Sequence, residues 1–177
     1  MMSKPTRPAA GFTLVEILIV VVILGIASAV IVPKIGTRDD LKASAAARMV
    51  MADLIYAQNR AIAQQKKQYV QFDTAAQKYA VYDATPLATP ITHPVTKNSF
   101  VTMFGTGGTP GLTESALASV NFDGQTTVAF DELGQPLAYT AATNSTAALG
   151  TGTIVVRCGS NSLTISIEAY TGEISVN

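Results

Sequence analysis

The chain has 177 residues, a length that suits one globular domain with an additional segment. Its 12 basic and 12 acidic side chains cancel, which excludes a general electrostatic attraction to nucleic acid or to anionic lipid. The single cysteine, Cys158, cannot form an internal disulfide. Because β-forming residues precede it, we expect a small side chain buried in a sheet rather than a reactive thiol.

A long apolar block follows a short basic start. Residues 1–11 are polar and contain Lys4 and Arg7, whereas residues 12–32 carry a single charge. A helix over these residues would be about 31 Å long, close to the hydrocarbon thickness of a bilayer. It has no polar stripe of the kind that a helix on a soluble core shows. The block therefore predicts a transmembrane helix.

Three interpretations of this block stay open on the residues alone. A secretory signal fits the basic start, the apolar run and Ala27-Ser28-Ala29, and it would release a chain that begins at Val30. A plain signal anchor fits the apolar run as well. Neither needs Glu16, because a charge costs roughly 2.5–3.5 kcal/mol at the centre of a membrane helix and less near its interface. We expect that local stability does not explain Glu16 and that its value comes from a cationic partner.

The sequence Gly11-Phe12-Thr13-Leu14-Val15-Glu16 resembles the processing site of type IV prepilins and type II secretion pseudopilins. The resemblance implies that a prepilin peptidase cuts after Gly11 and methylates the new amine of Phe12. It also implies that the Glu16 carboxylate meets the N-terminal amine of a neighbouring subunit during filament assembly. An ammonium and a carboxylate that meet in a medium of low dielectric each offset part of the other's desolvation.

Charge alone leaves the orientation of the block undecided, because Lys4 and Arg7 precede it and Lys34, Arg38 and Lys42 follow it. The resemblance implies a cytoplasmic leader and a single-pass protein of the inner (cytoplasmic) membrane, with its C-terminal domain in the periplasm. It further implies incorporation into a periplasmic or surface filament. The implied partners are other pilins or pseudopilins, an inner-membrane assembly platform and membrane lipid.

A second helix is predicted after a break. Pro33 lacks an amide donor, and together with Gly36 it predicts a helix kink. Thr37 can cap a new start, and residues 41–66 contain neither proline nor glycine. We expect one apolar face to pack on the globular domain, with a separate partner-binding helix as the alternative. This predicted face consists of Leu41, Ala45, Met49, Ala52, Tyr56 and Ile62.

After Lys67 the pattern changes to a period of two, with β-forming residues. A hairpin is predicted at 68–72 and 78–82, and residues 140–152 predict a loose surface connection. Further strands are predicted at 100–104, 119–122, 126–130, 153–157, 163–167 and 173–176.

The predicted fold class is α+β, a long N-terminal transmembrane and stalk helix packed on a C-terminal antiparallel β-sheet domain. The predicted organisation is a leader peptide at 1–11, a transmembrane helix at 12–33, a stalk helix at 34–66 and a β domain at 67–177.

Two later stretches carry a second resemblance. Phe130-Asp131-Glu132-Leu133-Gly134-Gln135-Pro136 resembles the F-x-x-x-G-x-P turn of the GspH/FimT family. Residues 165–174, with Thr171-Gly172 before the last strand, resemble the closing hairpin of that family. This resemblance implies a minor pseudopilin or minor pilin rather than the most abundant subunit of a filament.

Signals for an enzyme or a cofactor are weak. The glycine-rich residues 105–111 lack the lysine and Ser/Thr of a phosphate-binding loop. His93 is the only histidine and has no partner nearby in sequence for a metal or a catalytic triad. Asp123, Asp131 and Glu132 fall at turns, where carboxylates often bind the backbone, and only a calcium site among them stays open. We predict no catalytic residue, no cofactor and no metal site.

Charge also argues against nucleic acid as a partner. From Arg38 onward there are nine Lys/Arg and eleven Asp/Glu, a balance of −2. DNA binding would need a basic patch, which only Lys66, Lys67 and Lys78 offer if folding gathers them.

We expect a minor pseudopilin of the type II secretion pseudopilus, which contributes to the initiation or tip of the filament and to protein export across the outer membrane. The alternatives are a minor type IV pilin in pilus priming, adhesion or DNA uptake and, from another class, a secreted β-domain protein released by signal peptidase.

Overall fold

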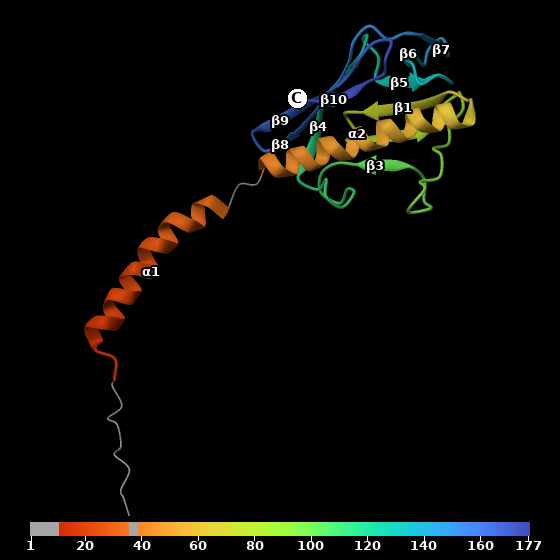
Figure 1. Ribbon diagram of the computed structural model, residues 1–177. Helices are drawn as coiled ribbons and strands as arrows, with labels where there is room; N and C mark the ends of the chain where they lie inside the picture. The colour runs from red at the N-terminus through yellow and green to blue at the C-terminus, as the bar shows by residue number, and fades with distance from the viewer. Residues whose placement is uncertain (1–10, 36–38) are drawn as a thin grey trace, which may run out of the picture. The chain divides into compact units, whose positions relative to one another are not determined.

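A computed structural model describes residues 11–35 and 39–177, with side chains described for 11–28 and 39–177. The chain divides into two compact units, one up to residue 38 and one from residue 39 (Figure 1). The first unit contains helix α1 (Leu14–Ile35). Pro33 lies inside α1, while Gly36 lies outside the described residues, so the predicted kink stays a prediction.

Helix α1 exposes apolar side chains around its whole circumference. The large apolar side chains from Phe12 to Ile26 are between 49% and 81% exposed. A helix that is apolar on every side is stable only in apolar surroundings, such as other helices or lipid. Within the described parts of the chain, no helix is both long and apolar enough to cross a membrane.

The second unit packs helix α2 (Asp39–Gln64) against two antiparallel sheets (Figure 1). The larger sheet has the strand order β3-β2-β1-β5-β6-β7, and the smaller has the order β10-β9-β8-β4. The strands of the larger sheet are β1 (Gln68–Asp73), β2 (Lys78–Tyr82), β3 (Val101–Met103), β5 (Thr127–Phe130), β6 (Pro136–Thr140) and β7 (Ser145–Ala148). Those of the smaller sheet are β4 (Ser115–Phe122), β8 (Gly152–Cys158), β9 (Asn161–Ile167) and β10 (Ile174–Val176). The predicted α+β class, with an N-terminal helix packed on antiparallel sheets, is confirmed.

The predicted hairpin is confirmed, since β1 and β2 pair antiparallel with Val70 opposite Val81. The prediction of a loose connection at 140–152 is wrong, because β7 lies inside it and pairs with β6. Strand β7 is an edge strand with mostly exposed side chains. Backbone hydrogen bonds to β6 place this strand with little side-chain burial, so its sequence shows little of the alternation by which strands are predicted.

The predicted packing face of α2 is wrong for four of its six residues, while Met49 and Tyr56 are partly buried against the core. Leu41 is 61% exposed and Ile62 is 43% exposed, while Ala45 and Ala52 are exposed too. The side chains that pack on the sheets are mostly small, which lets the helix backbone approach the sheets closely. These fully buried residues are Ala43, Ala46, Ala47, Val50, Leu54, Ala57 and Ala61.

Aromatic rings fill the space between α2 and the sheets. Phe72 packs against Tyr79 with ring centroids 5.2 Å apart and against Phe122 at 5.8 Å. Cys158, at the end of β8, is buried at 2% exposure, which confirms the prediction of a small side chain packed in a sheet. This core fixes α2 relative to the turns described below.

Candidate functional site

Gly11 and Phe12 lie just before the start of α1. Phe12 is 81% exposed, and a Cβ atom added to Gly11 would meet nothing within 4 Å. The residues that the structure describes therefore give no steric reason for glycine at position 11. A requirement for glycine there would have to come from a molecule that acts on this segment.

Thr13 and Glu16 form a capping box at the first turn of α1. The Thr13 Oγ1 atom accepts a hydrogen bond from the Glu16 amide at 3.2 Å, and Glu16 Oε2 accepts one from the Thr13 amide at 3.4 Å. A threonine followed three residues later by glutamate is the sequence signature of this reciprocal cap. The carboxylate also lies near the positive end of the helix dipole.

The capping box gives Glu16 a local role that was not expected, and the T-x-x-E spacing was the signal that could have shown it. The role of Glu16 in filament assembly stays a prediction. The capping box accounts for hydrogen bonding by Glu16 but supplies no cationic partner for its carboxylate. The ion pairs among the described side chains are Lys42–Glu114, Arg60–Asp83 and Lys66–Asp83, and none of them includes Glu16.

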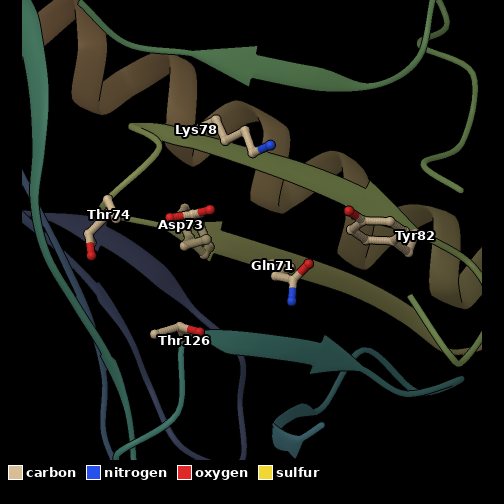
Figure 2. Close-up of a pocket in the computed structure, with 8 residues that line it drawn as sticks. Gln71, Asp73, Thr74, Lys78, Tyr82 and Thr126 are labelled. Carbon is tan, nitrogen blue, oxygen red and sulfur yellow. The ribbon is translucent and has the colours of Figure 1, made fainter. Parts of the chain in front are cut away.

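A shallow polar groove lies on the larger sheet, with a cavity volume of about 380 Å³ (Figure 2). Gln71 and Asp73 of β1 line it together with Lys78 and Tyr82 of β2. Asp73 and Lys78 lie opposite each other across the hairpin, and Asp73 Oδ1 accepts a hydrogen bond from the amide of Ala76 at 2.8 Å. The groove thus offers amide, hydroxyl and charged groups for polar contacts, without a nucleophile held by a base.

A largely buried cluster of polar side chains around Asp53 joins α2 to β2 and β3. The Tyr79 hydroxyl donates a hydrogen bond to Asp53 Oδ2 at 2.6 Å, and the Thr102 hydroxyl donates to the same oxygen at 3.4 Å. Burial raises the pKa of the Asp53 carboxyl, because desolvation disfavours its charged form, although the bond from Tyr79 opposes this shift. Sequence reasoning missed the cluster, since its three members come from different elements.

His93 has a structural environment. Its ring packs on Phe100 with centroids 4.4 Å apart. Its Nδ1 atom accepts hydrogen bonds from the amides of Val95 and Thr96 at 3.1 and 3.2 Å. Through these contacts His93 orders the loop between β2 and β3.

The carboxylates predicted at turns bind backbone amides. Asp123 accepts hydrogen bonds from Gly150 at 2.6 Å and from Thr151 at 2.9 Å, and Asp131 Oδ1 accepts two from the turn that follows it. The backbone interpretation of these two residues is confirmed. Within residues 11–35 and 39–177, no group of three or more His, Cys, Asp or Glu is arranged to hold a metal ion.

The two turns that carry the second resemblance meet at one side chain of α2. Gln58 Nε2 donates hydrogen bonds to the carbonyl oxygens of Gly134 at 2.9 Å and Gly172 at 3.1 Å. Both glycines adopt positive φ, +84° and +66°, which glycine tolerates best. We call this arrangement of Gln58, Gly134 and Gly172 the glutamine clasp.

Comparison with known proteins agrees with these features. Residues 6–32 match the family described as the prokaryotic N-terminal methylation motif. The fold is similar to that of the minor pseudopilin EpsH from the Type 2 Secretion System of Vibrio cholerae, with a TM-score of 0.52 and 10% identity. That similarity covers 77% of this chain and 96% of the EpsH chain. The chain combines the N-terminal methylation motif with a pilin-like fold.

Two crystal structures of the type IV minor pilin FimU from Pseudomonas aeruginosa are also similar to this pilin-like chain. They have TM-scores of 0.49 and 0.46, with 13% and 14% identity. The similarity covers 78% and 76% of this chain and 90% and 91% of the FimU chains. No curated protein sequence matches the chain significantly.

Proposed function

We propose that this pilin-like chain is a minor subunit of the pseudopilus of a type II secretion system, where it helps to initiate or tip the filament that drives export. The observation that carries the proposal is one chain that combines the N-terminal methylation motif with the fold of a minor pseudopilin. The motif belongs to chains that are processed for assembly, and the fold similarity spans almost all of EpsH.

The first unit supplies processing and anchoring in this proposal. A prepilin peptidase cuts after Gly11 and methylates the amine of Phe12, both of which lie exposed before α1. Residues 12–33 then anchor the subunit in the inner membrane, with the second unit in the periplasm. The apolar circumference of α1 supports this assignment, because such a helix needs lipid or other helices around it.

The second unit has a structural role in this proposal, without catalysis, a resident cofactor or nucleic acid. Its polar cluster around Asp53, its His93 and its turn carboxylates are all engaged in contacts that stabilise the fold. Its partners are other pseudopilins and the assembly platform of the inner membrane.

The test is a deletion of the gene in its native host, complemented with the wild-type chain or with a variant that cannot be cleaved at Gly11. We expect export of type II secretion substrates to fall at least about tenfold in the deletion and to return only with the cleavable chain. Normal export together with loss of surface pili would contradict the secretion role and favour a minor type IV pilin. A mature chain that begins at Val30 would instead identify a protein released by signal peptidase.

A further inference from the structure

Three exposed large apolar side chains come from the segments that meet at the glutamine clasp. Ile62 of α2 is 43% exposed, Leu133 is 83% exposed and Tyr170 is 80% exposed. We call these three residues the turn patch. Single exposed apolar residues are ordinary on protein surfaces, but a contiguous group of them marks an interaction site more often.

Contacts around the clasp bring together the segments that carry the three side chains. The position of a Cβ atom on Gly134, the neighbour of Leu133, lies 2.9 Å from Ile62 Cδ1. The corresponding position on Gly172, two residues after Tyr170, lies 2.8 Å from the carbonyl oxygen of Gly134. Both turns are thus held side by side against the same end of α2.

The turn patch is held rigidly, as an interface requires for a low entropy cost on binding. Asp131 Oδ1 accepts a hydrogen bond from the Leu133 amide at 2.9 Å, and Gln65 Nε2 donates to the Glu132 carbonyl at 3.1 Å. Tyr170 has φ +68°, a strained value for a bulky residue. Backbone strain that presents an exposed aromatic ring is an observation from which a function can be inferred.

The charges beside the turn patch identify the kind of partner. Glu132 precedes Leu133 in the sequence, and Glu168 and Glu173 lie on either side of Tyr170. The sequence has no basic residue from Cys158 to Asn177. The basic side chains at this end of α2 are engaged elsewhere. Arg60 and Lys66 lie 3.9 and 3.4 Å from Asp83, and Lys67 donates to Thr146 at 3.2 Å.

We propose that the turn patch docks a different pilin-like subunit, one that presents an apolar surface flanked by Lys or Arg. A symmetric contact between two copies of this chain would bring acidic residues against acidic residues, which is unfavourable. The proposal rests on the proposed function, because it assumes that the chain assembles with other subunits of a filament.

The test measures binding of the full chain in detergent to each of the other pilin-like subunits of the same host, purified singly. The variants are the double substitution Leu133→Ser with Tyr170→Asn, and the charge reversal Glu132→Lys with Glu173→Lys. Val95→Ser is the matched control, since Val95 is 80% exposed in the loop between β2 and β3. Thermal unfolding shows whether the variants fold, and we expect Tm to change by no more than about 4 °C because the substituted side chains are exposed.

We expect one subunit to bind the wild-type chain and the Val95→Ser control with equal affinity. The same subunit should bind the double variant at least about tenfold more weakly. It should also bind the charge-reversed variant more weakly, and that binding should lose its dependence on salt. Binding of the double variant at wild-type strength would overturn the docking surface, as would the absence of binding to every subunit. Unchanged binding of the charge-reversed variant would overturn the basic partner. A wild-type dimer that the double variant abolishes would identify a second copy as the occupant instead.

The proposed function fails in a different way. If the chain is not a filament subunit, the wild-type chain is not cut at Gly11 and the deletion strain exports normally. If only the docking surface is wrong, the double variant is cut normally and restores export as well as the wild-type chain does.

Discussion

Glu16 contributes both a helix cap and a charge, and substitutions can separate the two. Thr13→Val removes a capping hydroxyl and keeps the carboxylate, whereas Glu16→Gln keeps a capping side chain and loses the charge. Glu16→Ala loses both. If assembly needs an ionic pair with the amine of a neighbouring subunit, Thr13→Val should cross-link to its neighbours nearly as the wild type does, while both Glu16 variants fail. All three should still be inserted and cleaved.

Cross-linking of adjacent subunits in cells, run beside an export assay, measures this difference. Loss of the cap alone should cost about 0.5–2 kcal/mol of local helix stability. Failure of Thr13→Val together with success of Glu16→Gln would assign the role of Glu16 to the cap. Full cross-linking and export by Glu16→Ala would show that this residue has no role in assembly.

Asp53 should make the stability of the second unit depend on pH. Burial raises the pKa of its carboxyl in the folded state, so the folded protein binds this proton more tightly than the unfolded chain does. Its contribution to stability is present below the pKa of the unfolded chain and is lost as pH rises through the higher folded value. Asp53→Asn keeps an acceptor for the Tyr79 hydroxyl and removes the titration, so we expect a flatter profile of stability against pH.

Urea denaturation of the full chain from acidic to neutral pH measures that profile. Glu168→Gln is the control, because Glu168 is an exposed carboxylate at a turn. Parallel profiles for the wild type and Asp53→Asn would contradict a contribution from the buried cluster.

At the scale of elements, the glutamine clasp joins α2 to two turns and leaves no space for a side chain at Gly172. A Cβ atom there would lie 2.5 Å from Gln58 Nε2 and 2.8 Å from the Gly134 carbonyl oxygen. Gly107 has a similar positive φ of +79° but nothing within 4 Å of that position. Gly172→Ala should therefore destabilise the fold by about 1–3 kcal/mol more than Gly107→Ala does.

The free energies of unfolding of the two variants, measured with denaturant, give this difference. Because Gly172 and Gly107 have similar φ values, the backbone strain caused by alanine is similar in the two variants. The difference between their free energies of unfolding therefore measures the cost of the close contacts at the clasp. Equal losses of stability at the two positions would show that the clasp is not tightly packed.

Helix α2 shows why sequence periodicity mispredicted a face. The predicted stripe followed the larger apolar residues, such as Leu41 and Ile62, but the sheets contact a stripe of alanines with Val50 and Leu54. This helix carries two apolar stripes, one of alanines with Val50 and Leu54 and one that contains larger side chains. Hydrophobicity alone predicts that the stripe with larger side chains is the buried one. Packing buries the alanine stripe instead, because small side chains allow the helix backbone to approach the sheets.

At the scale of the whole molecule, processing of the leader determines what the mature protein is. We expect N-terminal sequencing and mass spectrometry of the mature chain to find methylated Phe12 as its first residue. Gly11→Ala, or a bulkier substitution, should leave the precursor uncut while the second unit stays folded, because no described residue lies within 4 Å of a Cβ atom at that position. A mature chain that starts at Val30 would contradict the prepilin interpretation.

The whole molecule should also bind duplex DNA poorly. Nine Lys/Arg and eleven Asp/Glu follow from Arg38 onward, and Lys66 and Lys67 already contact Asp83 and Thr146. We expect affinity no better than that of a neutral protein at physiological salt. A gel shift at submicromolar concentration that weakens steeply with added salt would contradict this and favour a role in DNA uptake.

Local features of this protein were readable from its sequence. The methylation motif, the apolar run after it, the hairpin of β1 and β2 and the turn carboxylates depend on residues close together in the chain. Short-range patterns of this kind report backbone preference and side-chain periodicity directly. The cap formed by Thr13 and Glu16 is equally local, and it was missed because the charge of Glu16 drew the interpretation toward a partner.

Only the tertiary structure decided which face of α2 is buried, which edge β7 joins and which groups meet in the interior. The hydrogen bond from Tyr79 to Asp53 joins residues 26 apart in sequence, and those from Gln58 join residues 76 and 114 apart. Such contacts depend on how the elements fit together rather than on the preferences of any one segment. The turn patch follows from the same fit, because the segments that carry Ile62, Leu133 and Tyr170 meet only once two distant turns close on one helix.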